Sequence, residues 1–141
     1  MTEPVWIDEA TALAIHDRSL LLHGGASGVR DLGLLRSALA RPQQLAAYGD
    51  HPDLIERAAA LAAGIVHNHP FVDGNKRTDF VVGILFLEIN GGRFEASEEA
   101  AAQAVLSLAD GSLDEAGYAA FLRATARLQQ SHSGTAADRP R

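Results

Sequence analysis

The sequence lacks three features that would each point to a particular class of protein. None of its 141 residues is cysteine, which excludes disulfides, thiolate metal sites and cysteine nucleophiles. Lys and Arg number 12 against 18 Asp and Glu, so the net charge is −6 and no overall basic surface for nucleic acid is expected. No apolar run approaches the ~20 residues of a membrane span, and the first six residues lack the apolar core of a signal peptide. We therefore expect a cytoplasmic protein that binds neither nucleic acid directly nor a membrane.

What is present is typical of one globular domain. Apolar residues make up 47% of the chain and charged residues 21%. The apolar residues recur at helical spacing nearly throughout, and alternating runs are too few for a sheet. We predict an all-α fold, a single compact domain of about six helices over residues 1–130. Residues 131–141 turn to Ser, Gly, Ala, Pro and charge, which predicts a disordered tail.

Start and stop signals divide the domain into elements. The predicted helices cover residues 7–22, 32–40, 53–68, 75–89 and 97–109, with a short extended piece at 93–96 and a last helix that opens at Asp114. The second helix is expected to stop before Pro42, because proline cannot continue a helix interior, and residues 43–52 are expected to form a loop. The helix over 75–89 is apolar around most of its circumference, so we expect it to be the central buried helix.

The densest cluster of reactive side chains lies in residues 67–78, between two strongly apolar helices. Gly74 and Asn75 open the second of these helices, and the first main-chain N–H groups of a helix lack partners and carry partial positive charge. Lys76 and Arg77 add two full charges in the same turn, where cations are normally unfavourable. A bound polyphosphate would remove this conflict, because the amides and the cations would then face an anion. Gly74 would let that anion approach the backbone closely.

Two further side chains complete a set suited to phosphate chemistry. Asp73 lies at the mouth of the predicted phosphate site, where a carboxylate is repulsive unless Mg²⁺ bridges it to the phosphates. His69 lies across the turn and can accept a proton near neutral pH. A base, a metal ligand and a cationic anion site together predict phosphoryl or nucleotidyl transfer to a hydroxyl group.

A purely structural explanation exists for each of these residues taken alone. Asp73 could be a helix N-cap, His69 a turn histidine bonded to the backbone, and Lys76 and Arg77 solvated surface. Phe71, between them, is expected to be a core anchor in either case. Because the reactive residues occur together, we favour the functional interpretation.

The segment HPFVDGNKRT at residues 69–78 resembles the signature of the Fic/Doc superfamily, and specifically of its death-on-curing (Doc) branch. The resemblance extends to GG at 24–25 and GVRDLGLL at 28–35, which look like the N-terminal flap region of the family. It also includes LARP at 39–42 and the segment from FL at 86–87 to NG at 90–91. The resemblance covers most of the chain and implies an all-helical, Fic-like fold.

The resemblance also implies a reaction. Most Fic enzymes transfer AMP to a protein hydroxyl and carry glycine between the asparagine and the arginine of the motif, a position that Lys76 occupies here, as in the Doc branch. Doc proteins resemble kinases instead: they transfer the γ-phosphate of ATP to a threonine of elongation factor Tu and stop translation. They are the toxins of type II toxin–antitoxin systems and are neutralised by a Phd-like antitoxin. Carried over to this sequence, the roles would be His69 as the catalytic base, Asp73 as the Mg²⁺ ligand, and Gly74, Asn75, Lys76 and Arg77 as the groups that hold the phosphates of ATP.

Two features of the sequence bear on regulation and activity. Asp79 stands where the family usually has a small apolar residue, and an acid there could weaken ATP binding or point away and merely favour the helix start. Many Fic enzymes carry an inhibitory helix patterned as Ser or Thr, three residues, Glu, then Gly or Asn. That pattern does not occur in this sequence, which fits inhibition by a separate partner.

Three alternatives to a Doc-like kinase stay open at this point. The first is a Fic-type AMP-transferase, and the second is a catalytically silent helical adaptor or regulator. The third is a metal-dependent HD phosphohydrolase, because His16 and Asp17 form an HD dipeptide. That third function would need His51, His67 and Asp73 to join His16, whereas we expect His16 simply to lie on a helix face.

Overall fold

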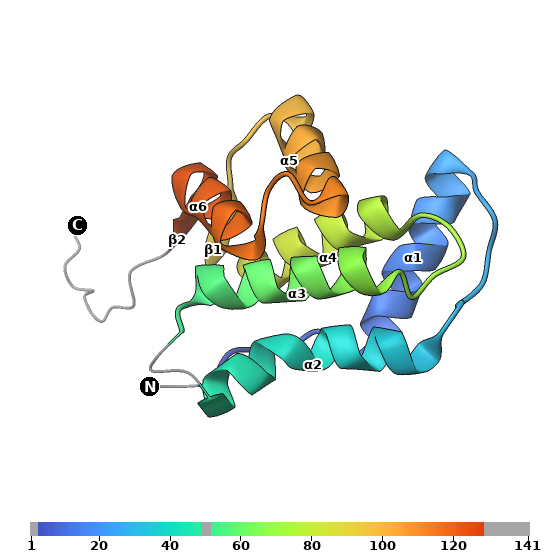
Figure 1. The fold of residues 1–141 in the computed structure, drawn as a ribbon, viewed down its shortest axis with the longest axis horizontal. Helices are drawn as coiled ribbons and strands as arrows, with labels where there is room; N and C mark the ends of the chain where they lie inside the picture. The colour runs from blue at the N-terminus through green and yellow to red at the C-terminus, as the bar shows by residue number, and fades with distance from the viewer. Residues whose placement is uncertain (1–2, 49–51, 129–141) are drawn as a thin grey trace.

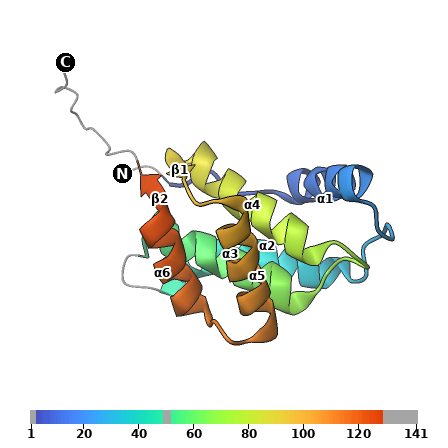
Figure 2. The ribbon, with the colours of Figure 1, turned by 90° about the horizontal axis from the view of Figure 1, so that it is seen from above.

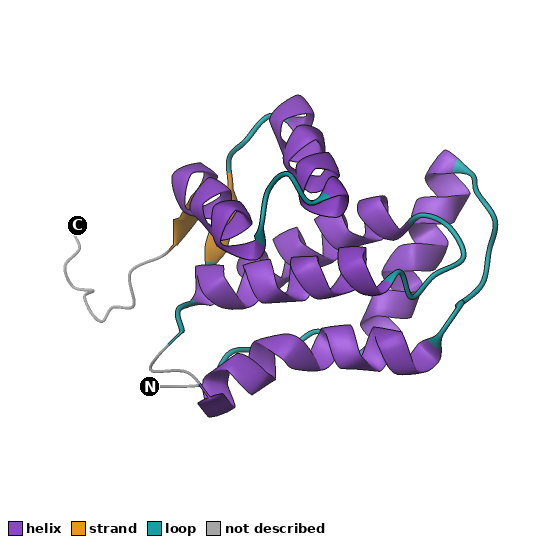
Figure 3. Cartoon of the chain, viewed as in Figure 1, coloured by secondary structure: helices purple, strands orange, loops and turns teal. Residues whose placement is uncertain are grey.

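The computed structural model describes residues 3–48 and 52–128 and confirms the all-α prediction (Figures 1 and 3). Its elements in chain order are α1 (Glu9–His23), α2 (Leu32–Tyr48), α3 (Leu54–Asn68), α4 (Asn75–Ile89), β1 (Gly92–Phe94), α5 (Glu98–Asp110), α6 (Glu115–Thr125) and β2 (Ala126–Leu128). No helix in the described ranges is both long and apolar enough to cross a membrane. The segment 131–141, for which a disordered tail was predicted, lies outside the described residues.

Local sequence signals fix where most of the helices begin. Asp8, Asp53, Ser97 and Asp114 cap α1, α3, α5 and α6, and each side chain accepts a hydrogen bond from a main-chain N–H of the first turn. Helix α4 differs, because Gly74 precedes it and no side chain caps its N–H groups. The first turn of α4 therefore keeps the unpartnered amides that the sequence analysis predicted.

Helices α3 and α4 form the centre of the domain. Helix α3 contacts α2, α4, α5 and α6, whereas α4 contacts α1, α3, α5 and β1. Figure 1 shows α2 running alongside α3, and Figure 2 shows α5 and α6 on the side of the pair away from α1. Burial is more complete in α3, where residues 58–66 are all buried, than in α4, where Val81 and Ile89 are exposed. The helix over 75–89 is thus central in its contacts but has a narrower buried face than its apolar sequence suggested.

Pro42 lies inside α2, so the prediction that this helix stops before it, with a loop over 43–52, is wrong. Helix α2 packs closely along α3: a Cβ added to Gly64 of α3 would lie only 3.1 Å from Ala38 Cα of α2. Arg41, next to the proline, also donates a hydrogen bond to the Ala60 carbonyl of α3 at 2.9 Å. This packing outweighs the hydrogen bond that proline cannot donate, and the residues after Pro42 are good helix formers.

Two short strands close the end of the domain opposite the α3–α4 loop (Figure 1). They are antiparallel, and the register pairs Gly92 with Leu128, Arg93 with Arg127 and Phe94 with Ala126. The extended segment expected at 93–96 therefore exists but covers residues 92–94, whereas β2 was not expected. The sheet is remote from the reactive residues, which all lie at the other end of the helices.

Candidate active site

The loop between α3 and α4, residues 69–74, carries most of the predicted site. His69 ends α3 in the left-handed conformation, with a φ of 52°, and Pro70 then prevents the helix from continuing. Gly74 precedes α4 with a φ of 79°, a conformation that favours glycine. Phe71 is fully buried, as predicted for a core anchor. The loop is thus a tight turn held down by one aromatic side chain.

Asn75 fixes the shape of this turn through a buried side chain. Its Oδ1 accepts a hydrogen bond from the Phe71 N–H at 3.0 Å, and its Nδ2 donates to the Phe71 carbonyl at 2.9 Å. The same Nδ2 lies 3.1 Å from His69 Nδ1. The side chain is therefore occupied within the loop, and what Asn75 offers to a phosphate is its main-chain N–H at the start of α4.

His69 lies at the surface with its imidazole ring oriented by Asn75. Because both ends of the Asn75 amide are fixed by Phe71, its NH₂ group faces the ring and His69 Nδ1 accepts. Neutral His69 therefore carries its hydrogen on Nε2 in this arrangement, and the ring lone pair belongs to Nδ1.

A second segment, residues 24–31, joins α1 to α2 and lies against the loop. The N–H groups of Arg30 and Asp31 donate to the Pro70 carbonyl, and the Val72 N–H donates to the Gly28 carbonyl. These bonds make a short antiparallel bridge between two parts of the chain that are about forty residues apart in sequence. The hydrogen bonds from residues 24–31 therefore stabilise the loop, in addition to the burial of Phe71.

The side chain of Arg30 makes a further contact with the end of α3, which was not predicted from the sequence. Its Nε donates to the His69 carbonyl and its Nη2 to the Asn68 carbonyl, both at 2.7 Å. Basic side chains near a helix C-terminus satisfy the last carbonyls and oppose the negative end of the dipole. Arg30 thus holds the main chain of His69 where α3 ends.

The Asp73 carboxylate lies between two main-chain N–H groups. Its Oδ2 accepts from Ala26 at 3.2 Å and its Oδ1 from Gly74 at 2.8 Å. These hydrogen bonds, that from Ala26 foremost, lower the pKa of Asp73, so the carboxylate is ionised at neutral pH. Gly25 is required beside it, because its φ is +120° and an added Cβ would lie 2.9 Å from Asp73 Oδ2. Since Gly74 precedes α4 and no side chain caps that helix, Asp73 is free of the capping role considered above.

The donor set at this point suits Mg²⁺ better than a transition metal. One exposed, ionised carboxylate matches the way Mg²⁺ is held by one or two carboxylates together with phosphate oxygens and water. Nowhere in the described part of the chain do three His, Asp or Glu side chains gather as a metal-binding group, which an HD-type hydrolase would require. His51, one residue considered for that group, lies outside the described residues.

All the residues of the predicted site line one hollow of about 260 Å³. Its lining residues are His69, Val72, Asp73, Gly74, Asn75, Lys76 and Arg77. Six of these seven residues were singled out from the sequence, and the structure brings all six together. Lys76 and Arg77 are both exposed in the first turn of α4, so their charges are available to a ligand.

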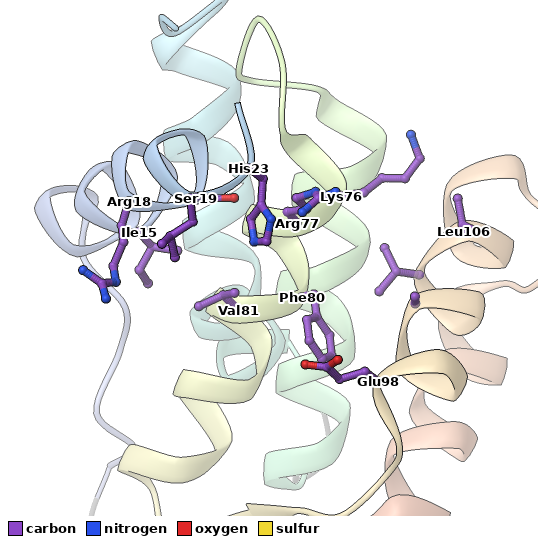
Figure 4. Close-up of a pocket in the computed structure, with 13 residues that line it drawn as sticks. Ile15, Arg18, Ser19, His23, Lys76, Arg77, Phe80, Val81, Glu98 and Leu106 are labelled. Carbon is purple, nitrogen blue, oxygen red and sulfur yellow. The ribbon is translucent and has the colours of Figure 1, made fainter. Parts of the chain in front are cut away.

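Lys76 and Arg77 also border a larger hollow between α1, α4 and α5 (Figure 4). Its volume is about 650 Å³, which lies within the range of small-molecule sites. The walls are mostly apolar, with side chains such as Ile15 and Phe80, and Arg18 and other basic residues lie at the edge. The small, polar hollow and the larger, mostly apolar hollow therefore lie on either side of Lys76 and Arg77, which border both.

Asp79 lines neither hollow, which agrees with the expectation that it points away from the site, but it lies beyond the first turn of α4 and so does not serve the helix start as that expectation supposed. Its side chain is fully buried, and neither carboxylate oxygen has a hydrogen-bond partner in the described structure. Burial raises the pKa of Asp79 well above its ordinary value. The carboxyl group therefore lies in the core, near Tyr118 of α6. Burial raises the pKa of the Tyr118 phenol, and a charge on Asp79 raises it further.

His16 lies on a face of α1, as expected, but its contacts were not foreseen from the sequence. It is 2% exposed and contacts the α3–α4 loop. Ala12, His16 and Ser19 form the buried stripe of α1 at helical spacing. A histidine within such a stripe is the one signal in the sequence that could have marked it.

Comparison with known proteins agrees with the resemblance read from residues 69–78. The Fic/DOC family matches residues 6–87. The chain is 48% identical over 75 residues to the protein named Toxin Doc of Mycolicibacterium smegmatis, in an alignment that covers 52% of this chain and 57% of that protein. It is 35% identical over 89 residues to the protein named Protein kinase doc of Escherichia phage P1, with 63% of this chain and 71% of that protein covered. The chain thus aligns with little more than half the length of the first of these relatives.

Proposed function

The chain belongs to the Fic/DOC family, in its Doc branch, and from this premise we propose that it transfers the γ-phosphate of ATP to a hydroxyl group of a protein. One observation carries the proposal. An exposed histidine, an ionised aspartate and two cations at an uncapped helix start all line one hollow of about 260 Å³. These are the parts that phosphoryl transfer needs: a proton acceptor, a metal ligand and a site for the phosphate charge.

The phosphates would lie at the start of α4. The free amides of the first turn, Gly74 before it, and the side chains of Lys76 and Arg77 are the groups available to them. This placement gives the two cations an anionic partner and removes their conflict with the helix dipole. The apolar hollow on the other side of Lys76 and Arg77 is large enough for the nucleoside.

Asp73 would hold Mg²⁺ beside the phosphates. When bound, the ion neutralises phosphate charge that develops during transfer. Asp73 suits this role because the N–H groups of Ala26 and Gly74 keep it ionised and oriented. Each oxygen accepts one hydrogen bond and keeps further lone pairs for a ligand.

His69 would accept the proton of the target hydroxyl. The hydroxyl oxygen forms a bond to the γ-phosphorus, the bond from that phosphorus to the β,γ-bridging oxygen breaks, and ADP leaves. In the arrangement observed, the lone pair of the neutral ring is on Nδ1, 3.1 Å from Asn75 Nδ2. The contact with Asn75 must therefore lengthen, or the hydrogen must move between the ring nitrogens, as the target binds.

The biological role that we propose is that of the toxin of a type II toxin–antitoxin system. The target would be a threonine of elongation factor Tu or another protein of translation, and its phosphorylation would inhibit translation in the cytoplasm. A Phd-like antitoxin would neutralise the activity. An apolar segment of that partner, seated in the 650 Å³ hollow, would exclude the nucleoside, so binding of the partner and of ATP would be mutually exclusive.

The proposal is tested by following two positions of the label in ATP. The full chain is incubated with Mg²⁺, elongation factor Tu and ATP labelled at the α- or the γ-phosphate. Label from the γ-position alone is expected on a threonine. Label from the α-position would replace the proposal by AMP transfer, and no label from either would contradict both reactions on elongation factor Tu.

Two histidine variants separate catalysis from folding. His69→Ala should abolish transfer, because the proton acceptor is lost. His67→Ala is the matched control: His67 lies two residues away, but its Nε2 is 3.0 Å from the Leu108 carbonyl of α5 and it does not line the small hollow. Equal growth of cells that produce the wild type and His69→Ala, without an antitoxin, would favour a silent adaptor instead.

A further inference from the structure

We infer that His16 is a positioning residue of the proposed reaction: it holds the main chain of Asp73 so that the carboxylate and the first amides of α4 face the same hollow. The inference rests on the proposed function for its consequence in nucleotide binding. Its structural part, that one buried imidazole of α1 sets the geometry of the α3–α4 loop, rests only on contacts.

The contact with Asp73 defines the state of the ring. His16 Nε2 lies 2.7 Å from the Asp73 carbonyl oxygen. A carbonyl can only accept, so Nε2 carries a hydrogen and donates it. This bond spans 57 residues of sequence and joins α1 directly to the residue proposed to hold Mg²⁺.

The rest of the ring is fixed by packing. It stacks on Phe71, with 3.8 Å between the ring centroids and 9° between the planes. Gly74 lies against its edge, since an added Cβ there would be 3.6 Å from His16 Nε2. His16 therefore lies against three residues of the loop, Phe71, Asp73 and Gly74, while it is itself almost inaccessible to water.

These contacts place His16 behind the functional groups rather than among them. It lines neither hollow, so it has no contact with a ligand there. The Asp73 carbonyl accepts a hydrogen bond from His16, whereas the Asp73 carboxylate accepts from the N–H groups of Ala26 and Gly74. Loss of the His16 donor would let the Asp73 peptide rotate and would misalign both the carboxylate and the Gly74 N–H.

Two variants separate the hydrogen bond from the packing. His16→Phe keeps a flat ring that can stack on Phe71 but has no donor. His16→Gln loses the stacking but keeps an N–H at a similar distance along the side chain. If the donor matters, His16→Phe should impair the loop and His16→Gln should restore it, although His16→Gln disturbs the packing more.

The experiment measures the full chain in two ways. The first is the hydrogen-exchange rate of residues 70–76, and the second is the Mg²⁺ concentration at which a fluorescent ATP analogue binds. Loss of one buried hydrogen bond should raise that Mg²⁺ concentration about tenfold in His16→Phe and quicken exchange in the loop. His16→Gln should stay near the wild type in both.

Two results would overturn the inference. In the first, His16→Phe matches the wild type in exchange and in Mg²⁺ dependence. In the second, both variants are impaired equally and in proportion to their loss of thermal stability, so that His16 would be a core residue and nothing more. A wild type that does not bind the ATP analogue contradicts the proposed function, and loop exchange then still decides the role of His16.

Discussion

Asp79 allows a quantitative test of the structure, because both of its carboxylate oxygens are buried without a partner in the described residues. A buried polar group without a hydrogen bond costs about 1–3 kcal/mol even when it is neutral, and more when it is charged. The folded state therefore keeps the proton, and the pKa of Asp79 is raised well above 3.8. Asp79 therefore lowers the free energy of unfolding at every pH at which its carboxyl group is ionised in the unfolded protein. Replacing it with a residue that cannot ionise should remove that loss of stability.

The sign of the pH dependence follows from proton linkage. Between the ordinary pKa and the raised one, the folded state binds more protons than the unfolded state. The contribution of Asp79 to the free energy of unfolding is therefore largest at low pH and falls as the pH rises through the pKa of the folded state. Within that window the slope approaches about 1.4 kcal/mol per pH unit.

The assay is urea unfolding of the wild type and Asp79→Asn, followed by circular dichroism, between about pH 5 and about pH 8. Asparagine has nearly the same shape but cannot ionise, so the variant should gain stability relative to the wild type as the pH rises. The difference between the two proteins removes the contributions of all other groups, including Asp73, whose lowered pKa gives a slope of opposite sign at acidic pH. Asp17→Asn, at an exposed position of α1, is the matched control and should change stability by less than about 0.5 kcal/mol. A difference between wild type and Asp79→Asn that does not vary with pH would refute the reasoning.

Glycine substitutions give further tests, each with a matched control. Gly25→Ala should weaken Mg²⁺-dependent binding of ATP, because the new methyl group would meet Asp73 Oδ2 at 2.9 Å. Gly24→Ala brings the similar strain of a positive φ but has nothing within 4 Å, so it should weaken binding much less. A titration with a fluorescent ATP analogue compares the two, and equal losses would count against the contact. Gly64→Ala should destabilise the packing of α2 on α3 by about 1–3 kcal/mol. Gly83→Ala, inside α4 with open space around it, should stabilise the protein by about 0.5–1 kcal/mol, and thermal unfolding that ranks these two variants the other way would contradict the helix packing.

Local signals in the sequence were sufficient for most of the fold and for the finding that the residues proposed as a site lie together. Asp53 and Asp114 mark helix starts that depend only on neighbouring amides, and Gly74 marks a turn whose backbone angle favours glycine. The residues from His69 to Arg77 are close in sequence, so any compact turn brings them to one place. These helix starts and this turn were predicted correctly because their interactions span only a few residues.

The features that were not predicted depend on contacts between distant segments. Pro42 stays helical because α2 packs on α3, and β2 forms because β1 lies beside it. Arg30 and His16 reach the loop from about forty and about sixty residues away, and nothing next to them in the sequence specifies that contact. Asp79 was noticed as unusual, but only its surroundings in the core show which way it points.

The most direct test of the central proposal is to map the amides that respond to ATP. The full chain, labelled with ¹⁵N, is titrated with ATP and Mg²⁺ and, separately, with adenosine, and amide shifts are followed by NMR. We predict that ATP with Mg²⁺ produces its largest shifts at the N–H groups of residues 74–77, whereas adenosine leaves those of Gly74 and Asn75, which line only the small hollow, unshifted. Shifts from ATP that leave residues 74–77 unchanged would contradict it.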